Sequence, residues 1–255
     1  MPQHQIVDLE SLVKERIKKF PFDKKEQDNM DKILPTDINW KNVAVFHGET
    51  TYSDASSFKK PNSHILFTAN FENRTDHVQK HSLKTERRTK STCTLKTEKA
   101  YSIGSSFQLK LVPPNPVIDA NAGFHGSLNV SKMDEETFEE ELVWAVDSQV
   151  SVQPGYKTSA NLVIREEEYI GSFTSETSFQ GLIHVTLRNK KDQSEMKTMT
   201  IPVTQVFTAE KGFTCDGVSS IFVNTGECRC RFGIEQKLTL AEEKLEENVE
   251  ENTED

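Results

Sequence analysis

The sequence contains no long hydrophobic run, and this excludes a protein anchored by membrane-spanning helices. No stretch approaches the roughly 18 consecutive apolar residues that such a helix requires. The N-terminal segment also lacks a charged region followed by an uninterrupted apolar core and a small-residue cleavage site, so no signal peptide is predicted. We therefore expect a soluble protein that is secreted or released to act on membranes, although a cytoplasmic location is also compatible with the sequence.

An excess of basic residues is missing as well. The chain has 31 Lys and Arg against 40 Asp and Glu, a formal net charge of −9. Nucleic-acid binding relies on basic side chains that neutralise phosphates, so no nucleic-acid partner is predicted. The acidity is concentrated at the C-terminus, and residues 239–255 are predicted to form an acidic tail that is distinct from the body.

Motifs for catalysis and metal binding are absent from the sequence. The seven histidines show no His-Glu-x-x-His spacing, and there is neither a Gly-x-Ser-x-Gly elbow nor a phosphate-binding loop. Cys215, Cys228 and Cys230 include a Cys-x-Cys pair with no histidine nearby, which argues against zinc. They are expected either to form a disulfide or to remain buried thiols in a hairpin that turns at residues 224–226. The chain is predicted to be no enzyme and to need no cofactor.

The N-terminal segment, residues 1–40, carries one helical pattern. Apolar residues recur there at steps of three and four, which predicts an amphipathic helix of about four turns that ends before Pro21. These residues are Ile6, Leu9, Val13, Ile17 and Phe20. Such a helix either caps the body or lies on a membrane surface, and capping is the commoner arrangement.

The body, residues 41–238, has the pattern of an all-β protein. Runs rich in β-branched and aromatic residues are bounded by Gly, Pro, Asn and Asp, and no helical period separates them. Several runs exceed ten residues, whereas a typical strand has about five or six. Long polar strands favour an elongated, twisted antiparallel sheet over a compact sandwich.

One segment, residues 101–133, alternates between apolar and polar residues on both sides of a loop, although Lys132 interrupts the apolar row of the second arm. This is the pattern of a hairpin with one apolar and one wet face. Each arm has about eleven residues, close to the roughly 9–11 that a β-strand needs to cross a bilayer. The apolar row consists of Tyr101, Ile103, Phe107, Leu109, Leu111, Phe124, Leu128 and Val130.

The alternation alone leaves two interpretations of this hairpin. Many soluble hairpins pack their apolar face on a core. If this one enters a membrane instead, its outer edges leave backbone groups unpaired in lipid, at a cost of several kcal/mol each. Only a closed barrel removes those edges, and the chain has one such hairpin. Insertion therefore requires several copies of the chain in a homo-oligomer.

Two long segments resemble the aerolysin and clostridial epsilon-toxin family. In residues 71–111, an Asn-x-Thr-Asp start is followed by a glutamine, Ser/Thr-rich strands and an amphipathic segment. Residues 142–181 are similar to the return of that module, with a Val-x-Pro-Gly-x-Lys-Thr turn at 152–158 and an apolar strand after it. The resemblance covers about residues 40–238, and it depends on the order of these features more than on any single motif.

The resemblance implies a fold and a function. Members of the family are elongated β proteins that assemble into rings on membranes and insert one hairpin per subunit as a β-barrel pore. The inserting hairpin corresponds by position to residues 101–133. The implied partners are a target-cell membrane, through lipid, glycan or protein, and further copies of the chain. The alternative is a non-lytic protein that binds carbohydrate or another partner and keeps the fold.

The sequence lacks a separate domain of the kind that binds receptors in this family. Receptor contacts would then come from aromatic residues of the first part of the chain, namely Trp40, Phe46, Tyr52 and Phe58, which are equally suited to a core. In many of these toxins a C-terminal peptide blocks assembly until it is cleaved. The acidic tail is a candidate for this role, with Lys237 and Lys244 as cleavage positions, or it is a solubilising extension.

Overall fold

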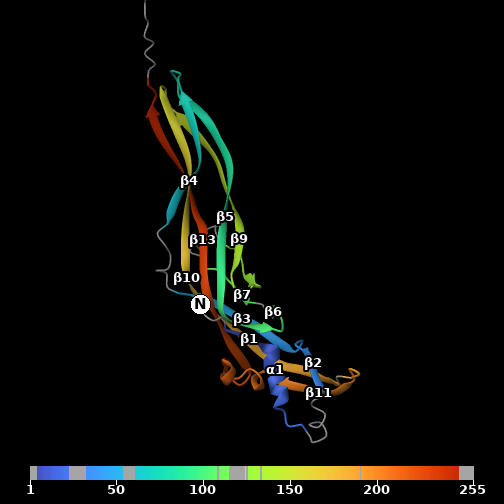
Figure 1. The fold of residues 1–255 in the computed structure, drawn as a ribbon. Coiled ribbons are helices and arrows are strands. Elements are labelled where there is room, and N and C mark those ends of the chain that lie inside the picture. Colours follow the sequence, from blue (N-terminus) through green and yellow to red (C-terminus); the bar gives the residue numbers. More distant parts are fainter. Residues whose placement is uncertain are drawn as a thin grey trace, which may run out of the picture.

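The computed structural model describes residues 5–22, 33–53, 61–107, 109–114, 124, 126–132, 134–189 and 191–246. The chain forms an elongated rod of long, twisted strands (Figure 1). Two antiparallel strands form its axis, β10 (Tyr156–Asn189) and β13 (Ser219–Lys244). At about 3.3 Å per residue, the 34 residues of β10 extend up to roughly 110 Å. The all-β, elongated architecture expected from the sequence is confirmed.

The upper half of the rod consists of two layers. Strand β4 (Asn62–Asn73) pairs with β10, whereas β5 (Gln79–Ile103) pairs with β9 (Glu136–Val152). Strand β5 also pairs with β13 over residues 92–99, and this links the layers. Alternate side chains of both layers form a small core, which contains Leu83, Val150, Val152 and Ala160 with Phe67, Phe71 and Leu238.

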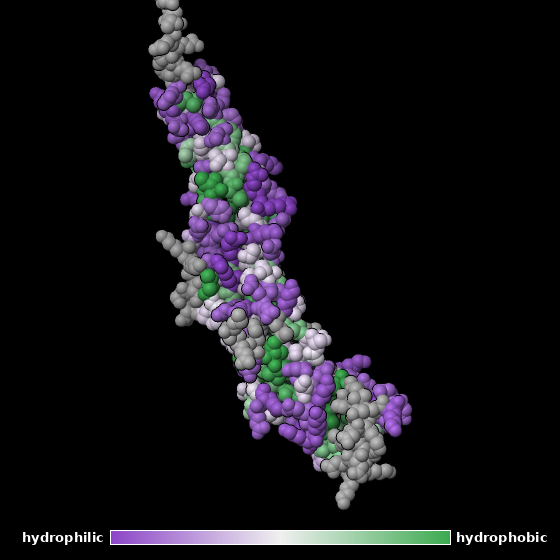
Figure 2. All heavy atoms as spheres, in the orientation of Figure 1, coloured by the Kyte–Doolittle hydropathy of each residue, from purple (hydrophilic) through white to green (hydrophobic). Residues whose placement is uncertain are grey.

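Ion pairs between β5 and β9 explain why such long strands tolerate so many charges. Lys84 pairs with Asp147 at 3.3 Å and Lys90 with Glu139 at 2.6 Å, on the exposed face of the strands. Each exposed pair contributes about 0–1 kcal/mol, so their main effect is to make the outer face of the sheet hydrophilic. Hydrophilic residues accordingly cover most of the face in Figure 2, with separate hydrophobic patches along the rod.

The lower end of the rod, here called the head, contains the largest core. The remaining elements there are β1 (Gln5–Asp8), α1 (Leu9–Lys18), β2 (Ile33–Asn39), β3 (Val43–Tyr52), β11 (Glu195–Pro202), β12 (Phe213–Cys215) and two 3₁₀ turns, η3 (Val203–Gln205) and η4 (Ala209–Lys211). Strands β2, β3 and β11 pair with β10, and β12 pairs with β13. Phe179, Phe207, Phe213 and Phe222 lie at the centre of this core.

The helix α1 is shorter than the pattern predicted, and it caps the head. Asp8 accepts a hydrogen bond from Glu10 N and caps α1, and Leu9, Val13 and Ile17 are buried in the head core. Ile6 belongs to β1, which pairs in parallel with β5. Among the described residues, no helix is both long and apolar enough to span a bilayer.

The expected turn at residues 224–226 is wrong, because β13 passes through these residues without a break. Asn224 is fully buried, and its amide donates to Ser175 O and to Thr177 Oγ1, both at 3.0 Å. A Cβ on Gly226 would lie 2.4 Å from Lys96 O. Asn224 therefore makes a buried polar contact, and Gly226 allows the close approach of a neighbouring strand; neither residue forms a turn.

Strand β13 also continues beyond residue 238, where the acidic tail was expected to begin. Residues 239–244 pair with β10, with Glu242 opposite Thr158 and Lys244 opposite Tyr156. Backbone pairing with β10 and the partial burial of Leu238 against the upper core hold this acidic segment in the sheet. The described part of the chain ends at Glu246, so residues 247–255 of the predicted tail lie outside it.

Replacing Gly181 by alanine is expected to lower the melting temperature. Gly181 has φ +108°, and an added Cβ would lie 2.1 Å from Asn42 O. The left-handed conformation alone costs an L-residue about 1–2 kcal/mol, and relief of the clash adds to this. Each kcal/mol corresponds to roughly 2–4 °C in a chain of this size.

Gly155→Ala is the matched control for this variant, because Gly155 also has a positive φ, +73°, but open space around its Cβ position. Calorimetry should show a clearly larger decrease in melting temperature for Gly181→Ala than for Gly155→Ala. Equal decreases would contradict the close approach of the β2–β3 connection to β10.

Candidate functional site

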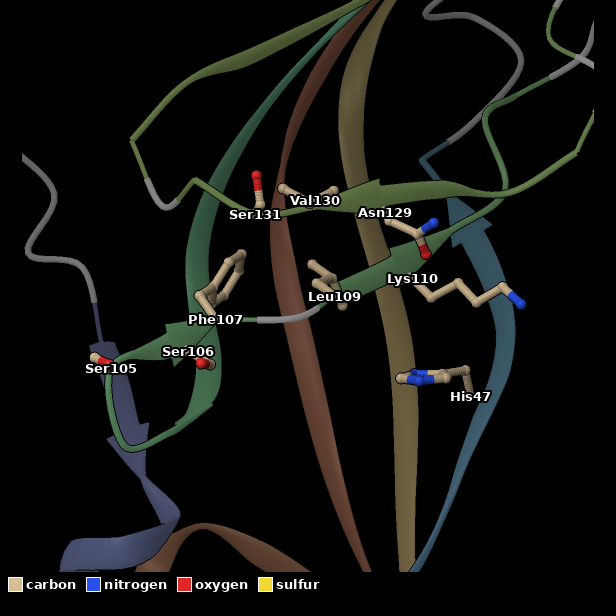
Figure 3. A pocket seen from close by; sticks show the side chains of 9 residues that line it. All are labelled: His47, Ser105, Ser106, Phe107, Leu109, Lys110, Asn129, Val130 and Ser131. Carbon is tan, nitrogen blue, oxygen red and sulfur yellow. The ribbon is translucent and has the colours of Figure 1, made fainter.

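Part of the alternating segment forms a small hairpin that is separate from the main sheet. Strands β7 (Leu109–Leu111) and β8 (Leu128–Val130) pair antiparallel, with Leu109 opposite Val130 and Leu111 opposite Leu128. A short strand, β6 (Ser106–Phe107), precedes them and pairs with the end of β5. In Figure 3 the hairpin lies in front of the long strands of the rod.

One face of this hairpin lies on the middle core of the rod. Phe107, Leu109, Leu111 and Val130 are exposed by 8%, 2%, 1% and 1%, whereas Lys110 on the opposite face is exposed. Phe124 and Leu128 are partly buried against the same core. This middle core contains Cys93, Leu95, Tyr169, Phe173, Cys228, Cys230 and Phe232. The hairpin therefore buries an apolar row and leaves its polar row in water.

The first arm is not the continuous eleven-residue strand that the alternation predicted. Tyr101 and Ile103 belong to the end of β5, and the Tyr101 ring packs edge-on against Phe179 at 5.0 Å in the head core. A turn follows at Gly104, which has φ +60° and donates its N–H to Asp8 Oδ1 at 3.1 Å. Residues 108, 115–123, 125 and 133 lie outside the description.

A few polar contacts attach the hairpin to the body. The Tyr52 hydroxyl donates to Val112 O, and Val112 N donates to Thr50 Oγ1 at 3.4 Å. On the other arm, the Glu136 carboxylate accepts hydrogen bonds from the N–H groups of Ser131 at 2.7 Å and Lys132 at 3.0 Å. Burial opposes ionisation of Glu136, but these hydrogen bonds outweigh it and lower its pKa.

A cavity of about 550 Å³ undercuts one side of the hairpin (Figure 3). Its wall includes His47 of β3, Phe107 of β6, Lys110 of β7 and Ser131, which follows β8. Partial burial, and next the charge of Lys110, lower the pKa of His47.

The predicted receptor residues fall into different environments. Trp40 stacks on Phe207 with ring centroids 6.4 Å apart, and Tyr52 packs edge-on against Tyr169 at 5.8 Å. These two rings therefore serve packing. Phe46 of β3 is 54% exposed beside a second cavity of about 290 Å³. Phe58 lies outside the described residues.

All four cysteines are free, so no disulfide joins Cys215, Cys228 and Cys230. Cys215 lies on β12 opposite Ser220, and its thiol donates to Phe207 O at 3.2 Å. Cys228 and Cys230 lie in the middle of β13, where they join Cys93 in the middle core. Sequence spacing missed Cys93 because it is distant along the chain. No cluster of three or more His, Cys, Asp or Glu suited to a metal occurs in the described ranges.

The predicted cleavage positions are strand residues. Lys237 pairs with Val163 and Lys244 with Tyr156 on β10. Proteases require an exposed, locally unpaired segment, and neither lysine lies in one in this structure.

Comparisons with known proteins place the fold. No protein-family model matches the sequence, and no curated protein sequence is significantly similar to it. A solved structure of a non-toxic crystal protein from Bacillus thuringiensis matches with a TM-score of 0.60 at 12% identity, over 94% of this chain and 98% of that chain. A chain of the Cry23Aa1 and Cry37Aa1 binary protein complex matches with a TM-score of 0.57 at 15% identity, over 95% and 92%.

The Mpp75Aa1.1 β-pore-forming protein from Brevibacillus laterosporus has a lower TM-score, 0.47, at 10% identity over 84% of this chain and 78% of that chain. The first two likenesses show the fold alone: the chain shares it with these two crystal proteins, and it is elongated and built of β-strands, as the sequence resemblance implied.

Proposed function

We propose that the protein forms β-barrel pores in a target membrane and inserts residues 101–133 from each subunit. The observation that carries this proposal is the separate hairpin β7–β8, whose apolar row is buried on the middle core while its polar row stays wet. Strands β7 and β8 pair with each other in a sheet of their own, so their release leaves the main sheet intact, whereas residues 101–107 must also leave the pairing of β5 with β1 and β6. Release also exposes an apolar row that is suited to lipid.

Energetic considerations favour a multi-subunit barrel as the end state. Burying a side chain such as leucine stabilises the closed form by about 1.5–3 kcal/mol, so the hairpin remains closed in water. A bilayer replaces that burial, whereas the backbone edges of the hairpin need new partners in lipid. Neighbouring copies supply these partners when their hairpins pair edge to edge. Lys110 and Asn129 then face the aqueous lumen.

The membrane-recognition surface is proposed to include Phe46. Its ring is more than half exposed, and it lies on β3 beside the second cavity, whose wall also includes Val112, the residue that follows β7. A contact here would act on the strand that holds the hairpin through Thr50 and Tyr52. Recognition and hairpin release would thus involve the same strand.

A non-lytic binding protein is the second candidate, and one observation favours it. The structure with the TM-score of 0.60 belongs to a protein described as non-toxic, so this fold occurs without toxicity. The two candidates differ in a single measurement. A pore-forming protein releases dye from lipid vesicles, and a binding protein associates with its ligand without releasing dye.

Leu109→Asp is expected to lower the rate of dye release more than tenfold. A lipid-facing Arg or Lys costs about 2–4 kcal/mol at the membrane midplane and an aspartate costs less, but every subunit of the barrel adds this cost, and about 1.4 kcal/mol corresponds to a factor of ten. Lys110→Asp is the matched control, because this neighbouring side chain lies on the wet face. It should keep most of the activity.

Leu109 is also buried in the closed form, so both variants should be compared at equal amounts of folded protein, measured by thermal melting. An equal decrease in dye release by both variants would contradict the assignment of the lipid-facing and water-facing sides of the hairpin. Unchanged release by Leu109→Asp would place the inserting segment elsewhere in the chain.

A further inference from the structure

Three buried thiols meet on the middle core where two long strands diverge. Cys93 of β5 lies directly opposite Cys230 of β13, and Cys228 is two residues away on the same face of β13. The exposed fractions of Cys93, Cys228 and Cys230 are 0%, 3% and 0%. Neither the proposed pore nor the packing of this core requires three cysteines at one point.

The Cys93–Cys230 pair lies close to the end of the pairing between β5 and β13. Pairing between β5 and β13 ends one residue beyond it, at Thr92 opposite Arg231. From there β5 continues upward with β9, while β13 continues with β10. A covalent link between Cys93 and Cys230 would therefore fasten the two layers of the rod at the point where they separate.

The backbone geometry suits a disulfide. Directly opposed residues of antiparallel strands have Cα atoms about 4.5–5.5 Å apart, within the roughly 4.4–6.8 Å that disulfides span. Cys93 and Cys230 are direct partners across the two strands, and both side chains are buried in the same core, so the two thiols lie on the same face of the sheet.

The closed form keeps these thiols unreactive. The neighbouring thiols of Cys228 and Cys93, together with burial, raise the pKa of Cys230, and the thiolate is the reactive species. The hairpin β7–β8 packs on the core that contains all three thiols. Displacing the hairpin would expose them to solvent.

We propose that Cys93 and Cys230 form a reversible disulfide that fastens β5 to β13, with Cys228 as the thiol that exchanges with it. The two thiols give up two electrons and two protons as the S–S bond forms, and hydrogen peroxide takes them up and becomes two molecules of water. Reduction by a dithiol restores both thiols. The oxidised chain keeps β5 on β13, whereas the reduced chain can separate them. This inference does not depend on pore formation.

The test uses the full chain with Cys215→Ser, which removes the exposed thiol. The protein is treated with hydrogen peroxide, alone and in urea below the unfolding transition, blocked with iodoacetamide and digested with trypsin without reduction. Trypsin cleaves after Arg229, so Cys228 and Cys230 fall in different peptides, and Cys93 falls in the peptide 91–96. Mass spectrometry can therefore assign each linkage.

The expected main product joins the Cys93 and Cys230 peptides, disappears with dithiothreitol and raises the melting temperature by roughly 5–10 °C. Cys228→Ala should retain this linkage, and Cys93→Ala should lose both the linkage and the rise in melting temperature. The proposal is overturned if no linkage forms in either condition, if linkage to Cys228 predominates, or if the linked protein melts no higher than the reduced protein.

Discussion

A Thr50→Cys/Val112→Cys variant is expected to release no dye from vesicles when oxidised and to recover full release on reduction. Thr50 lies on β3 and Val112 follows β7, with Thr50 Oγ1 3.4 Å from Val112 N. The two residues are therefore in direct contact, and they are the positions chosen for the bridge. The bridge would hold the first arm of the hairpin on the body, and an arm that cannot leave cannot enter lipid.

This experiment separates hairpin release from the stability of the closed form. The bridge leaves the apolar row in place, so the oxidised variant should melt at or above the temperature of the parent. A Cys93→Ala, Cys215→Ser background removes the proposed native bridge and the exposed thiol. Each single cysteine variant is a control and should release dye under both conditions. Full release by the bridged protein would show that this hairpin does not enter the membrane.

Replacing Phe179 by alanine is expected to destabilise the head by about 3–5 kcal/mol, the usual cost of removing a buried phenylalanine ring. Phe179 is 1% exposed, and its ring contacts those of Tyr101, Phe207 and Phe213 at centroid distances of 5.0, 5.4 and 6.2 Å. Urea unfolding at equilibrium measures the apparent free energy, and the midpoint should fall strongly.

Phe46→Ala is the control for this prediction. Phe46 lies on β3, and its pairing partner on β10 is Ser178, next to Phe179, but its own ring is 54% exposed. Its replacement should change stability by only about 0.5 kcal/mol. If the two alanine variants lost similar stability, the head would not depend on the aromatic core that the structure shows.

The hairpin β7–β8 shows which features a sequence pattern predicts and which it does not. Alternation identified the face of Phe107, Leu109, Leu111 and Val130 that is buried, because successive side chains of a strand point to opposite sides whatever the partner is. It did not reveal the turn at Gly104. That turn depends on a hydrogen bond to Asp8, which is 96 positions away in the chain.

The positions of the cysteines relative to one another could not be predicted from the sequence pattern. Sequence spacing linked Cys215 to Cys228 and Cys230, since Gly, Asn and Thr between them suggested a turn. The structure instead places Cys93 opposite Cys230. A register between strands more than 130 residues apart leaves no local signal, because it is set by the simultaneous pairing of β5 and β10 with β13.

The sequence by itself determined the class of fold, the position of the amphipathic helix and the apolar row of the hairpin, because each depends on local periodicity and on the burial of apolar surface. The acidic end also has a local signal in its composition. Only the tertiary structure decided that residues 239–244 belong to a strand, that the hairpin is closed over three thiols, and that Tyr52 holds it there. These features depend on which distant backbone or side chain completes a hydrogen bond or covers an apolar face, and no local pattern specifies that partner.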